Sequence, residues 1–229
     1  MSFCAEMEVP INKPEKKQNI ILEQQKQYLY EFWKNSRMIR NDSVLEAFLE
    51  VPRELFVEPS YRDQSYADHP LPIGSGQTIS QPTTVILMLQ LLDVLPGQRV
   101  LEIGTGSGYN AALLAKLVKS TGMVVTLERH SVLAEQASEN LRGAGLEEVV
   151  VIAGDGKLGY AEMAPYDRII ITAAADQVPQ NLKDQLAVGG FIVAPIGATH
   201  GCEMLKLYKT APDHFQTSSH GLFSFVPLV

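Results

Sequence analysis

Short apolar runs alternate with helix-like segments through the second half of the chain. Runs of four or five residues rich in Val, Ile and Leu have the length and composition of strands that are buried on both faces. Two further strands are expected over residues 205–208 and 222–229, joined by a polar turn. This order predicts an α/β fold with a doubly wound, mostly parallel, seven-stranded sheet and an antiparallel C-terminal edge strand. The apolar runs are residues 100–103, 123–127, 149–152, 168–172 and 191–195.

The first 50 residues predict two helices. Apolar residues recur at helical spacing over residues 21–33, which indicates an amphipathic helix to about Lys34. A second helix is expected around residues 44–48. Asn41 or Asp42 can cap its first turn, and the following proline stops it.

A long loop separates these helices from the remainder of the chain. Residues 57–81 show no sustained period, and loops of that length are usually functional or disordered. A strongly apolar helix follows over residues 84–92, with Ser80 as its expected N-cap. Between the fourth and fifth strands a helix is expected over residues 182–186, ended by Gly189 and Gly190.

Length and composition indicate a single domain. The 229 residues are enough to bury a core. Residues 1–18 carry two prolines, a Lys/Glu cluster and few large apolar groups, so we expect a flexible N-terminal extension. Residues 19–229 form the predicted domain, with the helices and a substrate loop over 19–95 and a cofactor-binding core over 96–229.

Charge and cysteine usage narrow the possible functions. The net charge of −7 disfavours DNA or RNA as a partner, because it gives no indication of a positively charged surface that could bind a phosphate backbone. No run approaches the roughly 18 apolar residues of a membrane span, and the start lacks the basic and apolar regions of a signal peptide. Cys4 and Cys202 are too few for a disulfide framework or a zinc site. We therefore expect a cytoplasmic protein without membrane, nucleic-acid or metal binding.

A glycine turn after the first strand of the core is the main candidate for chemistry. Gly104, Gly106 and Gly108 remove side chains from a strand-to-helix turn, so that the backbone can approach a ligand closely. A dinucleotide fingerprint needs a third Gly or Ala five residues after the first, but Tyr109 stands there. The spacing therefore favours a different nucleotide-type ligand.

Two further strand ends indicate which ligand that is. The second strand ends in Glu128, about 20 residues past the glycines, where an acid can accept both ribose hydroxyl hydrogens. The third runs into Gly154-Asp155-Gly156, a polar turn placed to meet a base edge. This combination describes a class I S-adenosylmethionine (AdoMet) methyltransferase. Glu102 either lies near the positive methionine end of the cofactor or only supports the turn. The predicted cofactor-binding residues are Glu102, Gly104, Thr105, Gly106, Ser107, Gly108, Glu128, Arg129, Asp155 and Gly156.

Several longer motifs resemble the protein-L-isoaspartate O-methyltransferase family. The likeness runs from about residue 43 to residue 229, and its most specific block is Gln77-Thr-Ile-Ser-Gln-Pro82. The sequence departs from bacterial members at Ser224, where Arg is frequent, and in the single basic residue, Arg129, after the second strand. The motifs are residues 51–57, 71–82, 100–109, 154–156, 164–167, 172–174 and 225–228.

The resemblance implies a Rossmann-like methyltransferase fold and a protein-repair activity. Members transfer a methyl group from AdoMet to the free α-carboxylate of isoaspartyl residues in aged proteins and peptides, leaving S-adenosylhomocysteine. Thr78 and Ser80 offer hydroxyl donors that orient this carboxylate, although for Ser80 capping a helix is an alternative or additional role. The resemblance further implies substrate contacts at Ile79, Ala173, Ala174 and Val178.

Two other functions fit the same residues. One is an AdoMet-dependent methyltransferase that modifies another carboxylate or a small molecule. The other is a module that binds AdoMet or damaged protein segments without turnover. The retained glycines, Glu128, Asp155 and Ser80 argue against a degenerate site.

Overall fold

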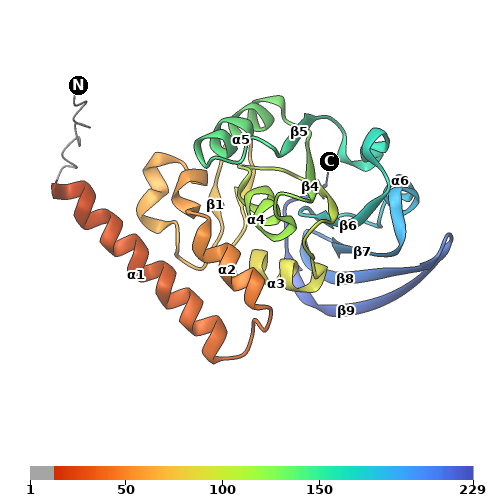
Figure 1. Ribbon diagram of the computed structural model, residues 1–229, viewed down its shortest axis with the longest axis horizontal. Coiled ribbons are helices and arrows are strands. Elements are labelled where there is room, and N and C mark those ends of the chain that lie inside the picture. The colour runs from red at the N-terminus through yellow and green to blue at the C-terminus, as the bar shows by residue number, and fades with distance from the viewer. Residues whose placement is uncertain (1–12, 229) are drawn as a thin grey trace, which may run out of the picture.

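The computed structural model of the protein describes residues 13–228, and its centre is a seven-stranded sheet (Figure 1). The strands are β3 (Arg99–Ile103), β4 (Met123–Glu128), β5 (Val150–Ala153), β6 (Tyr166–Ile171), β7 (Leu186–Ile196), β8 (His200–Ala211) and β9 (His214–Ser224). Their order across the sheet is β5-β4-β3-β6-β7-β8-β9. Neighbours from β5 to β7 are parallel, whereas β8 runs antiparallel to both β7 and β9. The predicted α/β class and seven-stranded sheet are confirmed.

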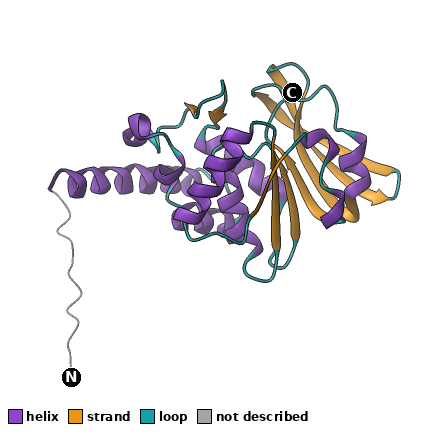
Figure 2. Ribbon diagram, turned by 90° about the horizontal axis from the view of Figure 1, so that it is seen from above, coloured by secondary structure: helices purple, strands orange, loops and turns teal. Residues whose placement is uncertain are grey.

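The described residues include six α-helices, which cover the two faces of the sheet (Figure 2). They are α1 (Lys13–Asn35), α2 (Asp42–Glu50), α3 (Pro82–Leu92), α4 (Tyr109–Val118), α5 (Ser131–Gly143) and α6 (Gln180–Gln185). A small hairpin of β1 (Leu71–Pro72) and β2 (Thr78–Ile79) lies in the long loop, together with the 3₁₀ turn η2 (Pro59–Gln64). A further 3₁₀ turn, η1 (Arg53–Phe56), comes just before this loop. Of the expected extension over residues 1–18, residues 1–12 lie outside the described part and the last six belong to α1. Among the helices of residues 13–228, none combines the length and the apolar composition that a membrane-spanning segment requires.

Alternate residues of the parallel strands pack into two separate hydrophobic cores, one on each face of the sheet. Val100, Val124 and Ile170 pack with the helices α1 to α5. Leu101 and the other residues of opposite parity pack with α6 on the far face. This alternation follows from the two-residue period of a strand, and it places both faces of the sheet under cover. The second core includes Leu101, Ile103, Val125, Leu127, Ile169, Ile171 and Leu182.

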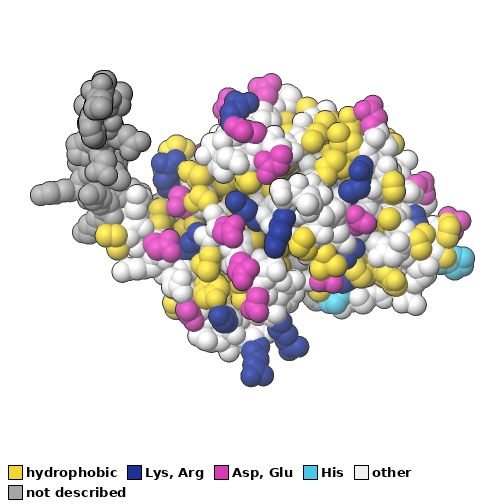
Figure 3. Space-filling model, viewed as in Figure 1, with side chains coloured by type: hydrophobic (Ala, Val, Ile, Leu, Met, Phe, Trp, Pro, Cys, Tyr) yellow, Lys and Arg dark blue, Asp and Glu magenta, His cyan; other side chains and the backbone are white. Residues whose placement is uncertain are grey.

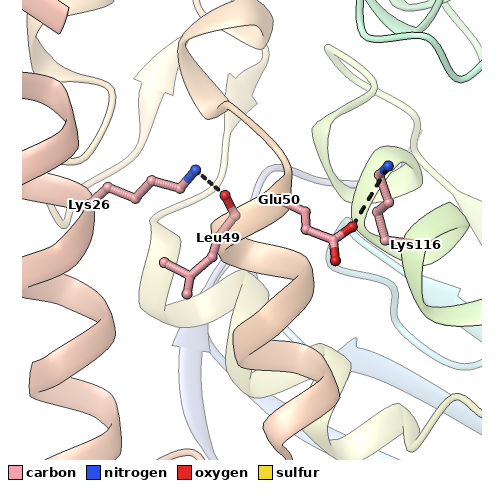
Figure 4. Close-up of polar contacts among 4 residues, drawn as sticks. All are labelled: Lys26, Leu49, Glu50 and Lys116. Atoms are coloured by element: carbon pink, nitrogen blue, oxygen red, sulfur yellow. Dashed lines mark hydrogen bonds and ion pairs between the residues drawn. The ribbon is translucent and has the colours of Figure 1, made fainter.

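The helix α1 is fastened to the domain near its C-terminal end. Trp33 is fully buried, meets the Phe48 ring edge-on at 4.7 Å between centroids, and donates from Nε1 to Thr83 Oγ1 at 2.9 Å. Lys26 Nζ donates to the Leu49 carbonyl of α2 (Figure 4). The earlier turns of α1 project away from the sheet in both views (Figures 1 and 2). The attachment therefore depends on one apolar stripe and few polar contacts.

Three local expectations were wrong in instructive ways. Ser80 does not cap α3, because Gln81 stands at the N-cap position of that helix. The capping hydrogen bond is made by Asp68, whose Oδ1 accepts from Thr83 N at 2.9 Å. Gly189 and Gly190 lie inside β7 rather than at the end of a helix, where the register against β6 shifts. The last strand covers residues 214–224, not 222–229, because an exposed edge strand needs no apolar alternation.

The packing of Trp33 generates a stability prediction. Trp33→Ala should lower the free energy of unfolding by about 3–5 kcal/mol, because a large buried ring is replaced by a cavity. Tyr28→Ala on the same helix is the control, since Tyr28 is 71% exposed and should change stability by about 0.5 kcal/mol or less. Urea unfolding followed by circular dichroism measures both variants. Tryptophan fluorescence cannot be used, because Trp33 is the only tryptophan and one variant lacks it. Equal stability of the two variants would show that α1 is not part of the cooperative unit.

Candidate functional site

The turn after β3 brings two strand ends into close contact. Thr172, which follows β6, donates from Oγ1 to the Gly104 carbonyl at 2.7 Å. A Cβ atom on Gly104 would stand 2.4 Å from that hydroxyl, and its backbone φ of +95° is one that side chains rarely adopt. Gly106 has a φ of +55°, and a Cβ there would approach Ile73 Cδ1 to 3.2 Å. This packing therefore requires glycine at position 104, and the positive φ together with the Ile73 contact disfavours a side chain at position 106.

Glu128 joins the glycine turn to the end of β4. Its Oε2 accepts from the Gly106 amide at 2.9 Å, and its Oε1 accepts from the His130 amide at 3.0 Å. The side chain is 6% exposed and lines the cavity above the turn. Each carboxylate oxygen has a further lone pair, so Glu128 can also accept two ligand hydroxyls. This is the geometry that a ribose-binding acid needs.

The cavity beside this turn collects most of the predicted residues. It is bounded by the glycine turn, the ends of β4 and β6, and the β2 segment. Glu102, Gly108, Asp155, Ala174 and Val178 are not among its lining residues. The predicted residues that line it are Thr78, Ile79, Ser80, Gly104, Thr105, Gly106, Ser107, Glu128, Arg129, Gly156 and Ala173.

The excluded residues have other contacts. Asp155 is exposed, and its Oδ1 accepts from Lys157 N at 2.9 Å. Val178 belongs to the core beneath α6, and Ala174 pairs through its backbone with the segment after β9. Their predicted roles in binding stay predictions.

Glu102 lies on the α4 face of β3, below the turn. Its Oε1 accepts from Asn110 Nδ2 and its Oε2 accepts from Thr126 Oγ1, each at 2.6 Å. Thr126 in turn shares a hydrogen bond of 2.6 Å with Thr105 of the turn. Complete burial raises the pKa of Glu102 from 4.5 to about 7, against the opposing effect of these hydrogen bonds. Of its two possible roles, the geometry favours support of the turn.

A second cavity adjoins the first and opens toward the sheet edge. It is lined by the start of α3, the beginning of β8 and the end of β9. Thr78 and Ser80 line both cavities, and their hydroxyl groups make no hydrogen bond within the described part of the chain. None of the residues that line the second cavity is Asp, Glu, Lys or Arg. Hydroxyl-bearing residues are frequent there: Thr78, Ser80, Thr83, Thr84, Thr172, Thr199 and Ser224.

The structure adds lining residues that the sequence did not indicate. His130 contributes a buried Nε2 without a hydrogen-bond partner in the described residues. The C-terminal segment also lines the cavity, because Leu228 N donates to the Ala174 carbonyl at 2.7 Å. Because His130 follows Glu128 by two residues, its place in the sequence could have indicated that it lines the cavity. The C-terminal segment gave no such indication, since it was expected to be a strand. The added residues of the first cavity are Gln77, Val85, Met88, Ile103, Tyr109, Asn110, Leu127, His130, Thr172 and residues 226–228.

No group of His, Cys, Asp and Glu side chains suited to a metal ion occurs in the described residues. The first cavity is lined instead by the glycine turn, by one acid, Glu128, and by the apolar residues Val85 and Met88 of α3. These features fit a nucleoside.

Comparison with known proteins gives a consistent family. Residues 23–229 match the family described as protein-L-isoaspartate(D-aspartate) O-methyltransferase (PCMT). A protein-L-isoaspartate O-methyltransferase of Methanopyrus kandleri is 48% identical over 202 residues, covering 88% of this chain and 89% of its own length. A protein named protein-L-isoaspartate O-methyltransferase 1 from Archaeoglobus fulgidus is 50% identical, covering 82% of this chain and 86% of its own length.

Solved structures agree. One protein-L-isoaspartate O-methyltransferase has a TM-score of 0.77 and 31% identity, covering 92% of this chain, which spans 65% of that chain's length. A putative protein-L-isoaspartate O-methyltransferase from Plasmodium falciparum, in complex with S-adenosyl-L-homocysteine, has a TM-score of 0.79 and 26% identity, with 88% of this chain and 97% of that one covered.

The raised pKa of Glu102 generates a prediction for the pH dependence of stability. Between pH 4.5 and about 7 the folded state retains a proton that the unfolded state has lost, so stability falls as pH rises through this window. Glu102→Gln keeps the acceptor for Asn110 and removes the titration. At about 1.4 kcal/mol per pKa unit, the variant should gain on the order of 3 kcal/mol relative to the parent between pH 5 and pH 8.

Urea unfolding at several pH values measures this difference. Glu135→Gln, on the exposed side of α5, controls for the loss of one negative charge. Parallel pH profiles for Glu102→Gln and the parent protein would contradict the prediction.

Proposed function

Because the chain belongs to the protein-L-isoaspartate O-methyltransferase family, we propose that it transfers the methyl group of AdoMet to the free carboxylate of L-isoaspartyl residues in proteins and peptides. The observation that carries this proposal is the meeting of two cavities at Thr78 and Ser80. One cavity has the glycine turn and acid that suit a nucleoside, and the other offers neutral hydroxyl groups. A methyl donor and an acceptor carboxylate can therefore face each other across these two residues.

The first cavity suits AdoMet in detail. Glu128 can accept from both ribose hydroxyls, and the backbone of the turn at Gly104 and Gly106 lines the cavity where the methionine part would lie. His130, whose backbone amide donates to Glu128, has a buried Nε2 atom that makes no hydrogen bond in the described residues. When bound, AdoMet supplies a sulfonium methyl group that an incoming carboxylate oxygen attacks, while the carbon–sulfur electron pair remains on sulfur.

The second cavity suits a carboxylate that must stay reactive. Such an acid has a pKa near 3.5 to 4 and is ionised at pH 7, so no general base is required. The enzyme needs only to hold the oxygen in line with the methyl group, which is catalysis by positioning. Thr78 and Ser80 can donate hydrogen bonds without the strong pairing that an Arg or Lys would impose.

The proposed partners are damaged proteins and peptides rather than nucleic acids. Acidic and basic side chains are interspersed over the face seen in Figure 3, and the net charge is −7. Neither feature favours a polyphosphate partner. We extend the proposal to a cytoplasmic location, which is supported by the presence of only two cysteines, of which Cys202 is free and buried.

Labelled AdoMet with matched aspartyl and isoaspartyl peptides tests the proposal. Base-labile methyl label on the isoaspartyl peptide alone is the expected result. Label on both peptides, or on a small carboxylic acid instead, would indicate another methyltransferase on this scaffold. Tight binding of AdoMet without any transfer would indicate a binding module.

Glu128→Ala should weaken AdoMet binding by about ten- to a hundredfold, because a charged acceptor typically contributes about 1.5–3 kcal/mol. Glu135→Ala, an exposed acid on α5, is the control and should bind AdoMet with parental affinity. Calorimetric titration of both variants measures the dissociation constants. Parental affinity in Glu128→Ala would remove Glu128 from the binding site.

Substitutions at Ser80 separate chemistry from folding. Ser80→Ala should preserve stability, since Ser80 caps no helix, and should lower turnover by about tenfold or more through loss of a donor to a charged acceptor. Ser80→Asp should fold and bind AdoMet but be nearly inactive, because its charge repels the acceptor carboxylate. Turnover of isoaspartyl peptide and thermal midpoints measure the two effects.

The matched control for the added charge is Ser75→Asp. Ser75 is exposed in the turn of the same β1–β2 hairpin and lines neither cavity. It should keep parental turnover. A folded Ser80→Asp protein that methylates as fast as Ser75→Asp would exclude contact between Ser80 and the acceptor.

A further inference from the structure

A buried guanidinium lies directly behind Ser80. Arg53 of η1 is fully buried, and its Nη2 donates to the Ser80 carbonyl at 2.8 Å. Its Nε donates to the Ser65 carbonyl at 2.7 Å, so the planar fork holds two segments of the long loop at once. The loop segment that carries the free hydroxyl is therefore anchored through its backbone.

The same guanidinium contacts the cofactor side of the site. Its Cζ lies 4.8 Å from the ring centroid of Tyr109, the first residue of α4, which lines the cofactor cavity. The amide of Arg53 donates to Tyr66 Oη at 3.1 Å, and Tyr66 donates to Glu54 at 2.6 Å, which fixes η1 itself. Arg53 therefore connects the segment that contains Ser80 to α4, the helix that follows the glycine turn.

Stability alone does not account for a cation in this place. No carboxylate forms an ion pair with Arg53 in the described residues, and its Nη1 has no hydrogen-bond partner there. Burial lowers the pKa of Arg53, which reflects the cost of keeping the charge away from water. Buried charges are poor stabilising groups, whereas a rigid fork fixes geometry well.

We propose that Arg53 is a positioning residue that holds Ser80, through its carbonyl, at the correct place relative to the cofactor cavity. This inference rests on the proposed function of Ser80. Arg53 lines neither cavity, and it acts only through the placement of the Ser80 hydroxyl. Misplacement of a reacting group by about 1 Å can cost about a hundredfold in rate, so one anchoring contact can have a large effect on turnover.

The chain contains a matched control in Arg168. This residue is 5% exposed, donates from Nε to the Asp93 carbonyl at 3.0 Å and from Nη1 to the Asp167 carbonyl at 2.9 Å, and stacks 4.5 Å from the Phe191 centroid. It lines neither cavity. Arg168→Lys therefore reproduces the loss of a buried fork over an aromatic ring without altering the site.

The test is a double-mutant cycle with Arg53→Lys and Ser80→Ala, measured as kcat, KM for isoaspartyl peptide and Kd for AdoMet. Lysine cannot reach both carbonyls with a planar fork, so Arg53→Lys should lower kcat about tenfold or more, with the Kd for AdoMet within about threefold of the parent. Arg168→Lys should keep parental kcat. In the Ser80→Ala background, Arg53→Lys should cause no further loss beyond about twofold.

Multiplicative losses in the double variant, or an equal loss in Arg168→Lys, would overturn the proposal. If Arg53→Lys does not fold, Arg53→Met and Arg168→Met replace the pair, and failure of only the Arg53 variants to fold would make Arg53 a structural residue and overturn the proposal.

Amide hydrogen exchange over residues 77–81 separates this inference from the proposed function. Exchange should become faster in Arg53→Lys and stay parental in Arg168→Lys, whether or not the parent methylates isoaspartyl peptide. Parental exchange in Arg53→Lys would overturn the positioning role, whereas absence of methylation by the parent protein would overturn the proposed function alone.

Discussion

The close approach of the β3 turn to the ends of β4 and β6 is the constraint on which the site depends. Thr172 holds the Gly104 carbonyl, and Glu128 holds the Gly106 amide from the opposite side. Parallel strands end at the same edge of a sheet, and ligands bind at the crevice outside those ends. One acid therefore has two tasks, since Glu128 shapes the turn and also faces the cavity that the turn creates.

The segment that contains Thr78 and Ser80 is held in place differently from the glycine turn. This segment, residues 77–81, ends a long loop whose regular structure is the 3₁₀ turn η2 and one short hairpin, and two side chains from earlier in the chain hold it. Asp68 accepts from the Thr83 amide and from Gln81 Nε2, while Arg53 holds the Ser80 carbonyl. Because the Ser80 carbonyl already accepts from Arg53, the Ser80 hydroxyl is not needed to pair the backbone at this position.

Local pattern predicted the sheet and the glycine turn, and it failed where contacts are long-range or where burial is absent. The helix cap of α3 comes from Asp68, which is 15 residues from the Thr83 amide that it binds, so no local spacing could reveal it. The edge strand β9 is polar and mostly exposed, so it lacked the alternation that marks a half-buried strand. For Glu102 a usable signal existed, since strand parity places it on the face opposite to Leu101 and Ile103.

On the proposed assignment of the two cavities, their distribution of charge allows a cation to bind beside an anion without strong pairing of either to the protein. The acidic side chain that lines the first cavity is Glu128, and each of its oxygens already accepts from one backbone amide, that of Gly106 or that of His130. The acceptor cavity has no formally charged Asp, Glu, Lys or Arg in its lining. A carboxylate held by hydroxyl groups keeps more of its nucleophilicity than one paired with a guanidinium, because strong charge-assisted hydrogen bonds stabilise the ground state. The attraction between the reactants themselves then acts along the line of transfer, and it disappears once both charges are neutralised, which favours release of the products.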